Sequence, residues 1–144
     1  MQIQEIMSNS VVAITPDESA SLAARLLARH NLGSLPVCTY DGNLVGIVTD
    51  RDIIVRCIAA DQDPRRVPVQ DIMSRELSVV SPDEDTRHAA DRMAKRQVRR
   101  LPVVENGVVK GMVSLGDLAV ARRCEAEAAE ALSEISENVV RRKK

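Results

Sequence analysis

The sequence contains no tryptophan and no phenylalanine, and Tyr40 is its single aromatic residue. A planar ligand therefore cannot be stacked between aromatic rings, and aliphatic side chains and backbone groups would have to hold it. Single-stranded nucleic acid is bound largely by stacking bases on aromatic side chains, so this mode of binding is disfavoured. The formal net charge of −1 also provides no overall field that would recruit nucleic acid or an anionic membrane surface.

Cysteine and histidine are scarce as well. Cys38, Cys57 and Cys124 lie far apart and form no Cys-x-x-Cys pair, so the sequence predicts neither a disulfide framework nor a zinc site. The only histidines are His30 and His88, which we expect to be solvated. We find no nucleophile paired with a base, no metal cluster and no Walker loop, so an enzyme is disfavoured and no cofactor is required.

Long apolar runs are also lacking, and none approaches the roughly 20 residues that span a bilayer. The first ten residues, MQIQEIMSNS, have no basic flank and no long apolar stretch, which argues against a signal peptide. We therefore expect a cytoplasmic protein. The chain of 144 residues, with 44% apolar and 28% charged residues, is long enough to bury a globular core.

What the sequence does contain is an internal repeat. Four segments recur in the same order, at an offset of 66 residues (70 − 4) for the first three and 65 (111 − 46) for the last. Two copies are too few for a long solenoid and predict two similar halves of one globule. The recurring segments are QEIMS and QDIMS from Gln4 and Gln70, TPDE and SPDE from Thr15 and Ser81, LPV from Leu35 and Leu101, and GIVTDRD and GMVSLGD from Gly46 and Gly111.

One repeat is predicted to form strand, helix, strand, strand, helix. Thr15 is the expected N-cap of the first helix, with Pro16 in its first turn and Glu18 completing a capping box. Asp-Gly and Asn-Gly pairs predict hairpin turns between the second and third strands. The predicted elements are strands 11–14, 35–39 and 44–48 with helices from 15 and over 50–60, then strands 79–80, 101–104 and 108–113 with helices 83–96 and from 115.

The sequence beyond Asp117 is rich in alanine and glutamate and free of glycine and proline, so it is predicted to extend the last helix. This helix could pack back on the domain, pair with a twin helix or meet a partner, and its final RRKK is expected to be a solvated end. Its predicted apolar stripe consists of Leu118, Ala121, Ala128, Leu132, Ile135 and Val139. The repeat boundaries predict domains at 1–64 (core 7–64) and 65–122 (core 73–122), followed by a helical extension and basic tail at 123–144.

The paired segments resemble tandem CBS (cystathionine-β-synthase) domains, known as a Bateman module, of the small stand-alone bacterial type. The resemblance covers about residues 1–120. It implies an α/β (α+β) fold in which two βαββα units pack through three-stranded sheets about a pseudo-twofold axis, with a C-terminal helix added. In many members the two clefts between the units bind AMP, ADP, ATP or S-adenosylmethionine as a regulatory ligand, and two modules commonly form a homodimer.

The phrase that ends each repeat places a hydroxyl three residues before a carboxylate. Asp52 and Asp117 would accept hydrogen bonds from the vicinal hydroxyls of a ribose, as an acidic residue does in dinucleotide-binding folds. Thr49 and Ser114 would contact phosphate or ribose near a helix N-terminus, where backbone amides favour an anion. The alternative is that these residues only cap the following helix.

The resemblance also brings a hydroxyl of the opposite repeat into each cleft, Ser81 beside Asp52 and Thr15 beside Asp117. For these two hydroxyls a capping role at the helix start is the competing explanation.

Arg99 and Arg100 precede LPV in the second repeat, where the first repeat has Gly33 and Ser34. Family members that bind phosphates often carry basic residues here, so the resemblance implies that both arginines clamp phosphate. We expect one stronger, phosphate-specific cleft and one weaker or empty cleft.

These expectations favour a regulatory module that senses an adenine nucleotide or S-adenosylmethionine and passes its ligand state to a partner protein. The alternative is a structural or interaction protein of the same fold, which binds no ligand and acts through its dimer surface and C-terminal helix. An open cleft bearing Asp52 or Asp117 would favour the first function, and clefts closed by bulky side chains would favour the second.

Overall fold

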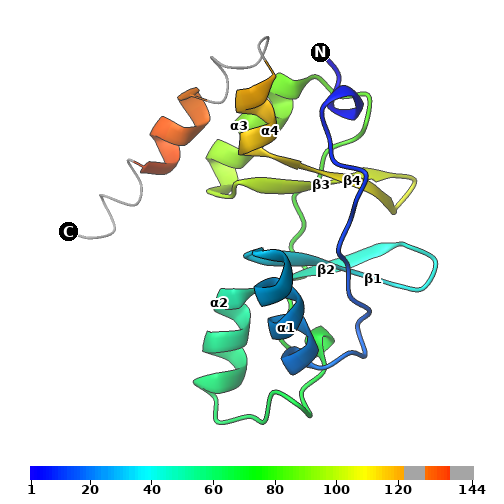
Figure 1. Ribbon diagram of the computed structural model, residues 1–144, viewed down its shortest axis with the longest axis vertical. Coiled ribbons are helices and arrows are strands. Elements are labelled where there is room, and N and C mark those ends of the chain that lie inside the picture. Colours follow the sequence, from blue (N-terminus) through cyan, green and yellow to red (C-terminus); the bar gives the residue numbers. More distant parts are fainter. Residues whose placement is uncertain (122–128, 137–144) are drawn as a thin grey trace. The chain divides into compact units, whose positions relative to one another are not determined.

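The structure is a computed structural model that describes residues 1–121 and 129–136. The chain forms two compact units (Figure 1). Unit I comprises Val12–Leu77, and unit II comprises Met1–Val11 together with the chain from Ser78 onward. Each unit combines a small antiparallel sheet with helices, as the predicted mixed α/β fold requires.

The opening segment of each repeat belongs to the other repeat's unit. Ser8 exchanges two backbone hydrogen bonds with Met112, with N···O distances of 2.8 and 2.9 Å, inside unit II. Ser74 makes the same pair of bonds with Ile47 inside unit I, also at 2.8 and 2.9 Å. The compact units therefore follow backbone pairing, whereas the boundaries 1–64 and 65–122 follow sequence similarity.

Unit I has a hairpin whose strands carry the LPV and GIVT segments. Ser34 lies opposite Thr49 at the open end of the hairpin, and the register shifts between Val37 and Cys38. The elements are α1 (Ala20–His30), β1 (Ser34–Cys38), β2 (Leu44–Thr49), α2 (Asp50–Asp52), the π-helix η2 (Ile53–Ile58) and the 3-10 helix η3 (Val69–Asp71).

Unit II repeats this hairpin, with Arg100 opposite Ser114 at the open end. Asn106 and Gly107 both have positive φ, 53° and 82°, as a two-residue type I′ turn requires. The elements are the 3-10 helix η1 (Ile3–Glu5), α3 (Thr86–Arg96), β3 (Arg100–Glu105), β4 (Val108–Ser114) and α4 (Leu115–Val120), followed by a helix over 129–136.

The predicted first strand of each repeat was wrong in extent, because each is a single parallel bridge, Ile14 to Val37 and Val80 to Val103. In unit I, Ile14 N donates to Pro36 O at 3.1 Å and Cys38 N donates to Ile14 O at 2.9 Å. The next bond of a parallel ladder needs an N–H at Pro36, which proline lacks. The proline of each LPV segment therefore stops this pairing, and each named sheet has two strands.

The predicted helix start at TPDE was also wrong, because α1 begins later, with Ser19 as N-cap accepting a 3.0 Å hydrogen bond from Leu22 N. The carbonyls of Pro16 and Glu18 instead accept hydrogen bonds from Gln70 N and Val69 N, at 3.1 and 2.8 Å. Carbonyls committed to another segment cannot accept intrahelical bonds, so TPDE forms a turn.

SPDE forms the corresponding turn in unit II, so its predicted role at a helix start was wrong too. Its carbonyls at Pro82 and Glu84 accept 2.9 Å hydrogen bonds from Gln4 N and Ile3 N. The following helix, α3, begins only at Thr86, with Asp85 as its N-cap.

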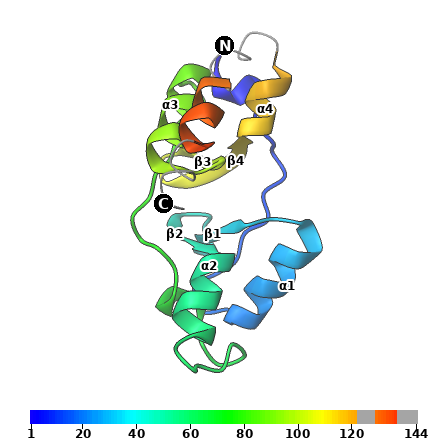
Figure 2. The same ribbon diagram turned by 90° about the vertical axis from the view of Figure 1, so that its left-hand side faces the viewer.

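The last helix does not continue through the tail as predicted. α4 ends at Val120, because Ala121 has extended backbone (ψ 109°), and residues 129–136 form a separate helix. Ala131 and Ile135 are buried, whereas Leu132 is 44% exposed, so the predicted stripe was wrong at Leu132. This helix lies beside α3 (Figure 2), which confirms the fold-back alternative. The predictions for Ala128, Val139, Cys124 and RRKK concern positions outside the described residues.

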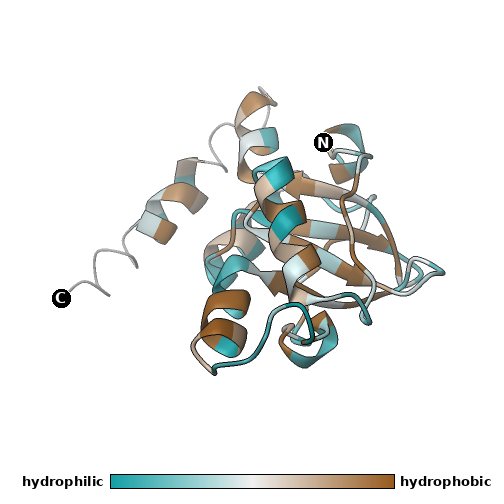
Figure 3. Cartoon of the chain, turned by 60° about the horizontal axis from the view of Figure 1, so that its bottom comes forward, coloured by the Kyte–Doolittle hydropathy of each residue, from teal (hydrophilic) through white to brown (hydrophobic). Residues whose placement is uncertain are grey.

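Each unit has its own apolar core, and the helices mix brown and teal residues as amphipathic helices do (Figure 3). In unit I the core is built around Leu35, Val37 and Val48. In unit II their counterparts Leu101, Val103 and Val113 have the same role. The repeated apolar positions thus build two separate cores that hold each strand-to-helix junction in place.

Candidate functional site

The repeated hydroxyl and carboxylate lie at the junction of a strand and a helix in each unit. In unit I, Thr49 Oγ1 accepts a hydrogen bond from Asp52 N at 3.0 Å, and Asp52 Oδ2 accepts one from Thr49 N at 2.9 Å. In unit II, Ser114 and Asp117 make the same two bonds, at 3.0 and 2.8 Å. Both pairs are capping boxes, so the capping role that the spacing allowed is confirmed.

These caps leave part of each side chain available. The Thr49 and Ser114 oxygens accept the capping bond, which leaves their hydroxyl protons free to be donated to another acceptor. Asp117 uses Oδ2 for the capping bond, and its Oδ1 has no hydrogen-bond partner among the described residues. Each junction therefore offers a donor suited to an anion and a carboxylate oxygen suited to a hydroxyl.

Arg56 distinguishes the junction of unit I. Its Nε lies 3.9 Å from Asp52 Oδ1, and its NH1 group donates to the carbonyls of Ile72 and Met73 at 3.2 and 3.3 Å. The corresponding position in unit II is Ala121 (56 + 65). Sequence reasoning missed Arg56, although the i, i+4 spacing of Asp52 and Arg56 on one helix was the signal that could have found it.

Two arginines distinguish the junction of unit II. Arg100 lies opposite Ser114 in the hairpin, and Leu115 N donates to Arg99 O at 2.8 Å, so both arginines adjoin the start of α4. Both residues are exposed. The structure thus brings Arg99, Arg100, Ser114 and Asp117 together at one end of the hairpin.

The junction of unit I has no cation at the corresponding positions. Ser34 lies opposite Thr49, and Asp50 N donates to Gly33 O at 3.1 Å. The first residue of the following helix is the acidic Asp50, where unit II has Leu115. The charge difference expected from the sequence is therefore present where each strand meets its helix.

Ser81 is committed to a network within unit II. Glu84 Oε1 accepts hydrogen bonds from Ser81 N and Ser81 Oγ, both at 3.0 Å, and from Arg92 NH1 at 3.1 Å. Arg92 also donates to Val79 O, and His88 Nδ1 lies 3.4 Å from Glu84 Oε2. Sequence reasoning missed this network, because Arg92 corresponds to Leu26 in the first repeat.

The network fixes the charge of Glu84. Burial acts to raise the pKa of this carboxyl, but the hydrogen bonds from Ser81 and Arg92 outweigh burial and lower its pKa. Glu84 is therefore ionised at neutral pH, and the Ser81 hydroxyl donates its proton to it. Thr15 Oγ1 likewise donates to Asp17 Oδ1, at 2.7 Å. Ser81 and Thr15 thus present only acceptor lone pairs, which suit a hydroxyl or amine of a ligand and not a phosphate.

The predicted site residues divide between the two units. Thr15, Thr49 and Asp52 belong to unit I, whereas Ser81, Arg99, Arg100, Ser114 and Asp117 belong to unit II. The predicted pairing of Ser81 with Asp52, and of Thr15 with Asp117, joins residues of different units and stays a prediction.

Metal and thiol chemistry have little support in the described part of the chain. It contains no group of three or more His, Cys, Asp or Glu side chains that could hold a metal ion. Cys38 and Cys57 are buried, and burial raises the pKa of both thiols, which makes them less reactive. Every helix among these residues is too short or too polar to cross a bilayer.

A family model for the CBS domain matches residues 3–58 and 69–123. The chain belongs to the CBS-domain family. Its two CBS domains include both capping boxes and both LPV segments. The chain is 38% identical over 134 residues to the CBS domain-containing protein YhcV of Bacillus subtilis, with 93% of this chain and 94% of YhcV covered.

Solved CBS-pair structures have the same fold. Hypoxic Response Protein I, crystallised with two coordinated zinc ions, matches with a TM-score of 0.78 and 29% identity over 84% of this chain and 98% of that one. The CBS-domain pair of protein MJ0100, in complex with 5′-methylthioadenosine and S-adenosyl-L-methionine, matches with a TM-score of 0.72 and 29% identity, covering 83% and 94%. CBS pairs are regulatory ligand-binding modules, and the MJ0100 pair binds adenosyl compounds.

Proposed function

We propose that this CBS pair is a regulatory module that binds an adenosyl compound, either AMP, ADP, ATP or S-adenosylmethionine. The observation that carries the proposal is the junction of unit II. There Asp117 Oδ1 is free to accept a ribose hydroxyl, Ser114 can donate a proton, and Arg99 and Arg100 supply positive charge. The adenosyl ligands of the MJ0100 pair support the same ligand class.

Whether each side chain can donate or accept a hydrogen bond indicates which group of the ligand it would contact. The carboxylates of Asp52 and Asp117 would accept from ribose hydroxyls, and the hydroxyls of Thr49 and Ser114 would donate to a phosphate or another acceptor. Because Ser81 and Thr15 have already donated their protons, they would accept from a ribose hydroxyl or an adenine amine. A ligand shared between the two units remains a prediction of the family resemblance.

The mechanism would be differential affinity. A ligand that binds one arrangement of the module more tightly shifts the population toward that arrangement, and a partner protein reads the shift. The proposal includes a cytoplasmic homodimer that needs no resident cofactor.

The exposed helix η2 offers an apolar surface for a second copy. Its residues Ile54, Val55 and Ile58 are 60%, 48% and 50% exposed. This surface is also what favours the second candidate function, an interaction protein that acts without a ligand.

Asp117→Asn is expected to weaken binding of the adenosyl ligand about 10- to 100-fold, since a hydrogen bond to a charged group contributes about 1.5–3 kcal/mol. Asparagine keeps one side-chain oxygen for the capping bond from Ser114 N and loses the charged second oxygen. Calorimetry with adenosine, AMP, ADP, ATP and S-adenosylmethionine measures the effect. Asp83→Asn, an exposed change in the same unit, is the matched control and should bind as the wild type does.

A second variant in the same titrations tests the phosphate contact. Replacing both Arg99 and Arg100 by glutamine should remove any preference for a nucleotide over adenosine, and Lys110→Gln, on the exposed side of β4, should preserve it. If no adenosyl compound binds the wild type more tightly than about 1 mM, which corresponds to only about 4 kcal/mol, the proposal fails and the interaction protein is favoured.

A further inference from the structure

Helices α1 and α3 correspond residue by residue. They cover Ala20–His30 and Thr86–Arg96, each with 11 residues, at the repeat offset of 66 (86 − 20). Both end at a residue with left-handed backbone, Asn31 in unit I and Gln97 in unit II. A surface position on one helix can therefore be compared directly with its counterpart on the other.

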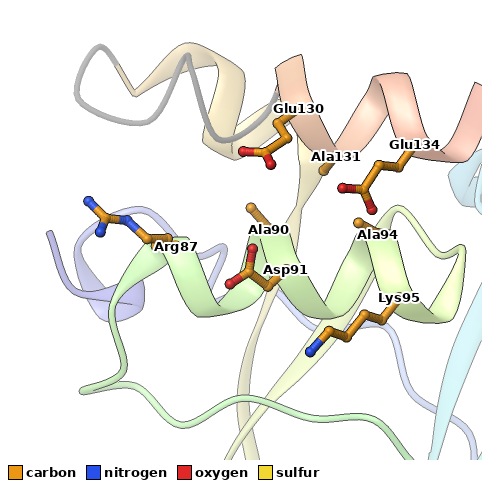
Figure 4. Close-up of a pocket in the computed structure, with 8 residues that line it drawn as sticks. All are labelled: Arg87, Ala90, Asp91, Ala94, Lys95, Glu130, Ala131 and Glu134. Atoms are coloured by element: carbon orange, nitrogen blue, oxygen red, sulfur yellow. The ribbon is translucent and has the colours of Figure 1, made fainter.

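On α3 one face is covered by the helix over 129–136. Ala90 and Ala94 are only 2% and 7% exposed, and Ala131 of the covering helix belongs to the same core cluster. Figure 4 shows Ala131 facing the side of α3 that carries these two alanines. Small side chains allow the backbones of two helices to approach closely, which makes this face suited to a helix.

Charged residues border this helix contact. Glu130 and Glu134 of the covering helix line a pocket of about 180 Å³ together with Arg87, Asp91 and Lys95 of α3 (Figure 4). The acidic Asp91 therefore lies near two glutamates, which is unfavourable, and the positive charges of Arg87 and Lys95 offset part of that repulsion.

No segment among the described residues covers the corresponding face of α1. Ala24 and Ala28, the counterparts of Ala90 and Ala94, are exposed. Arg25 stands where α3 has Asp91, and Arg29 stands where α3 has Lys95. Both arginines are exposed and have no ion-pair partner among the described residues. This α1 face, defined by Ala24, Arg25, Ala28 and Arg29, has the small residues of the α3 contact and more positive charge.

We propose that the α1 face is a docking site for an acidic amphipathic helix of a partner protein. The helix over 129–136 indicates the chemistry of that occupant, because it places Ala131 in the contact with α3 and has Glu130 and Glu134 beside it. The three charged positions of α3 at this pocket, Arg87, Asp91 and Lys95, carry a net charge of +1, whereas their α1 counterparts Ser21, Arg25 and Arg29 carry +2 and complement such glutamates better. In each copy the helix over 129–136 is already bound to α3 of its own chain, and the covalent connection gives it an effective concentration at α3 of about millimolar. A second copy at micromolar concentration therefore cannot readily supply its helix to the α1 face.

The probe for this proposal is a synthetic peptide with the sequence of residues 124–140, added to the full-length protein. Alanine methyl resonances of the protein report where the peptide binds. Saturable shifts are expected at Ala24 and Ala28, with Ala90 and Ala94 unchanged. Replacing both Arg25 and Arg29 by glutamate should weaken binding at least 10-fold, as should changing the glutamates of the peptide to lysine.

The matched control is replacement of both Arg65 and Arg66 by glutamate, which changes the charge of unit I equally at exposed positions outside the α1 face. This variant should bind the peptide as the wild type does, and thermal melts should show that both variants fold. Shifts confined to Ala90 and Ala94 would overturn the proposal, as would undiminished binding by the Arg25 and Arg29 variant.

Self-association provides a separate check. If the wild type sediments as a dimer that Ala28→Arg dissociates, the α1 face belongs to a second copy and the proposal is overturned. No adenosyl compound enters these measurements, so their outcome is independent of the proposed nucleotide binding.

Discussion

Gly111→Ala is expected to lower the free energy of unfolding of unit II by about 3 kcal/mol, at the upper end of the usual cost of overpacking. A Cβ atom at this position would lie 2.6 Å from Ser8 O and 2.8 Å from Met7 Sδ. Ser8 cannot move away easily, because two backbone hydrogen bonds hold it to Met112. Gly111 is therefore needed so that the segment containing Met7 and Ser8 can approach β4 closely.

The equivalent change in unit I should cost less, about 1–2 kcal/mol. A Cβ atom at Gly46 would meet the thioether of Met73 first and would lie 3.0 Å from Ser74 O. A methionine side chain is flexible and can adopt another rotamer, whereas a backbone carbonyl cannot. The difference in unfolding free energy between the two variants shows how much more a clash with a backbone carbonyl costs than a clash with a flexible side chain.

Gly116→Ala is the matched control, because a Cβ atom there would have its nearest neighbour, Ser114 Oγ, at an ordinary 3.6 Å. Gly116 lies in α4, where alanine is favoured over glycine by about 1 kcal/mol, so this variant should be neutral or more stable. Denaturant unfolding followed by circular dichroism measures all three. Equal stability of the Gly111 and Gly116 variants would contradict the pairing of Ser8 with Met112.

Much of the fold could be predicted from sequence because its causes are local. Each of these features depends on neighbouring residues: the Asn106-Gly107 turn, the alternation of buried and partly exposed residues in β4, and the apolar face of α3. Because the sequence repeats, each pattern occurs twice and could be predicted from two copies. The helix starts were wrong for a non-local reason. The carbonyls of Pro16 and Glu18 are taken by residues 69 and 70, about 50 positions away, which no capping rule considers.

The candidate site divides in the same way. The spacing of Ser114 and Asp117 is a local signal, and it correctly identified a junction where a hydroxyl and a carboxylate meet. The roles of Arg56 and Arg92 depend on carbonyls and carboxylates brought near them by folding, so composition and spacing alone could not assign them.

Glu84→Ala is expected to destabilise unit II by about 2 kcal/mol. The change leaves Ser81 N without its acceptor and removes the carboxylate that pairs with the guanidinium of Arg92. An unsatisfied buried donor costs about 1–3 kcal/mol, and the part-buried Ser81 N should cost less than the upper value. The contribution of the ion pair is modest because Arg92 is 39% exposed. Thermal and denaturant unfolding measure the loss.

Glu18→Ala is the matched control, because Glu18 is the repeat counterpart of Glu84 but is exposed and has Leu26 where unit II has Arg92. An exposed substitution of this kind should change stability by less than about 0.5 kcal/mol. A similar loss in both variants would mean that the Ser81–Glu84–Arg92 network does not stabilise unit II.

The pH dependence separates the charge of Glu84 from its packing. Because folding lowers the pKa of this carboxyl, its charged form contributes stability that is fully present above the ordinary pKa of 4.5 and is lost as the pH falls through the folded-state pKa. The stability gap between wild type and Glu84→Ala should therefore narrow as the pH falls well below 4.5. A gap that stays constant into that acidic range would mean that the side chain acts through packing, and that the Ser81 proton is not held by a carboxylate.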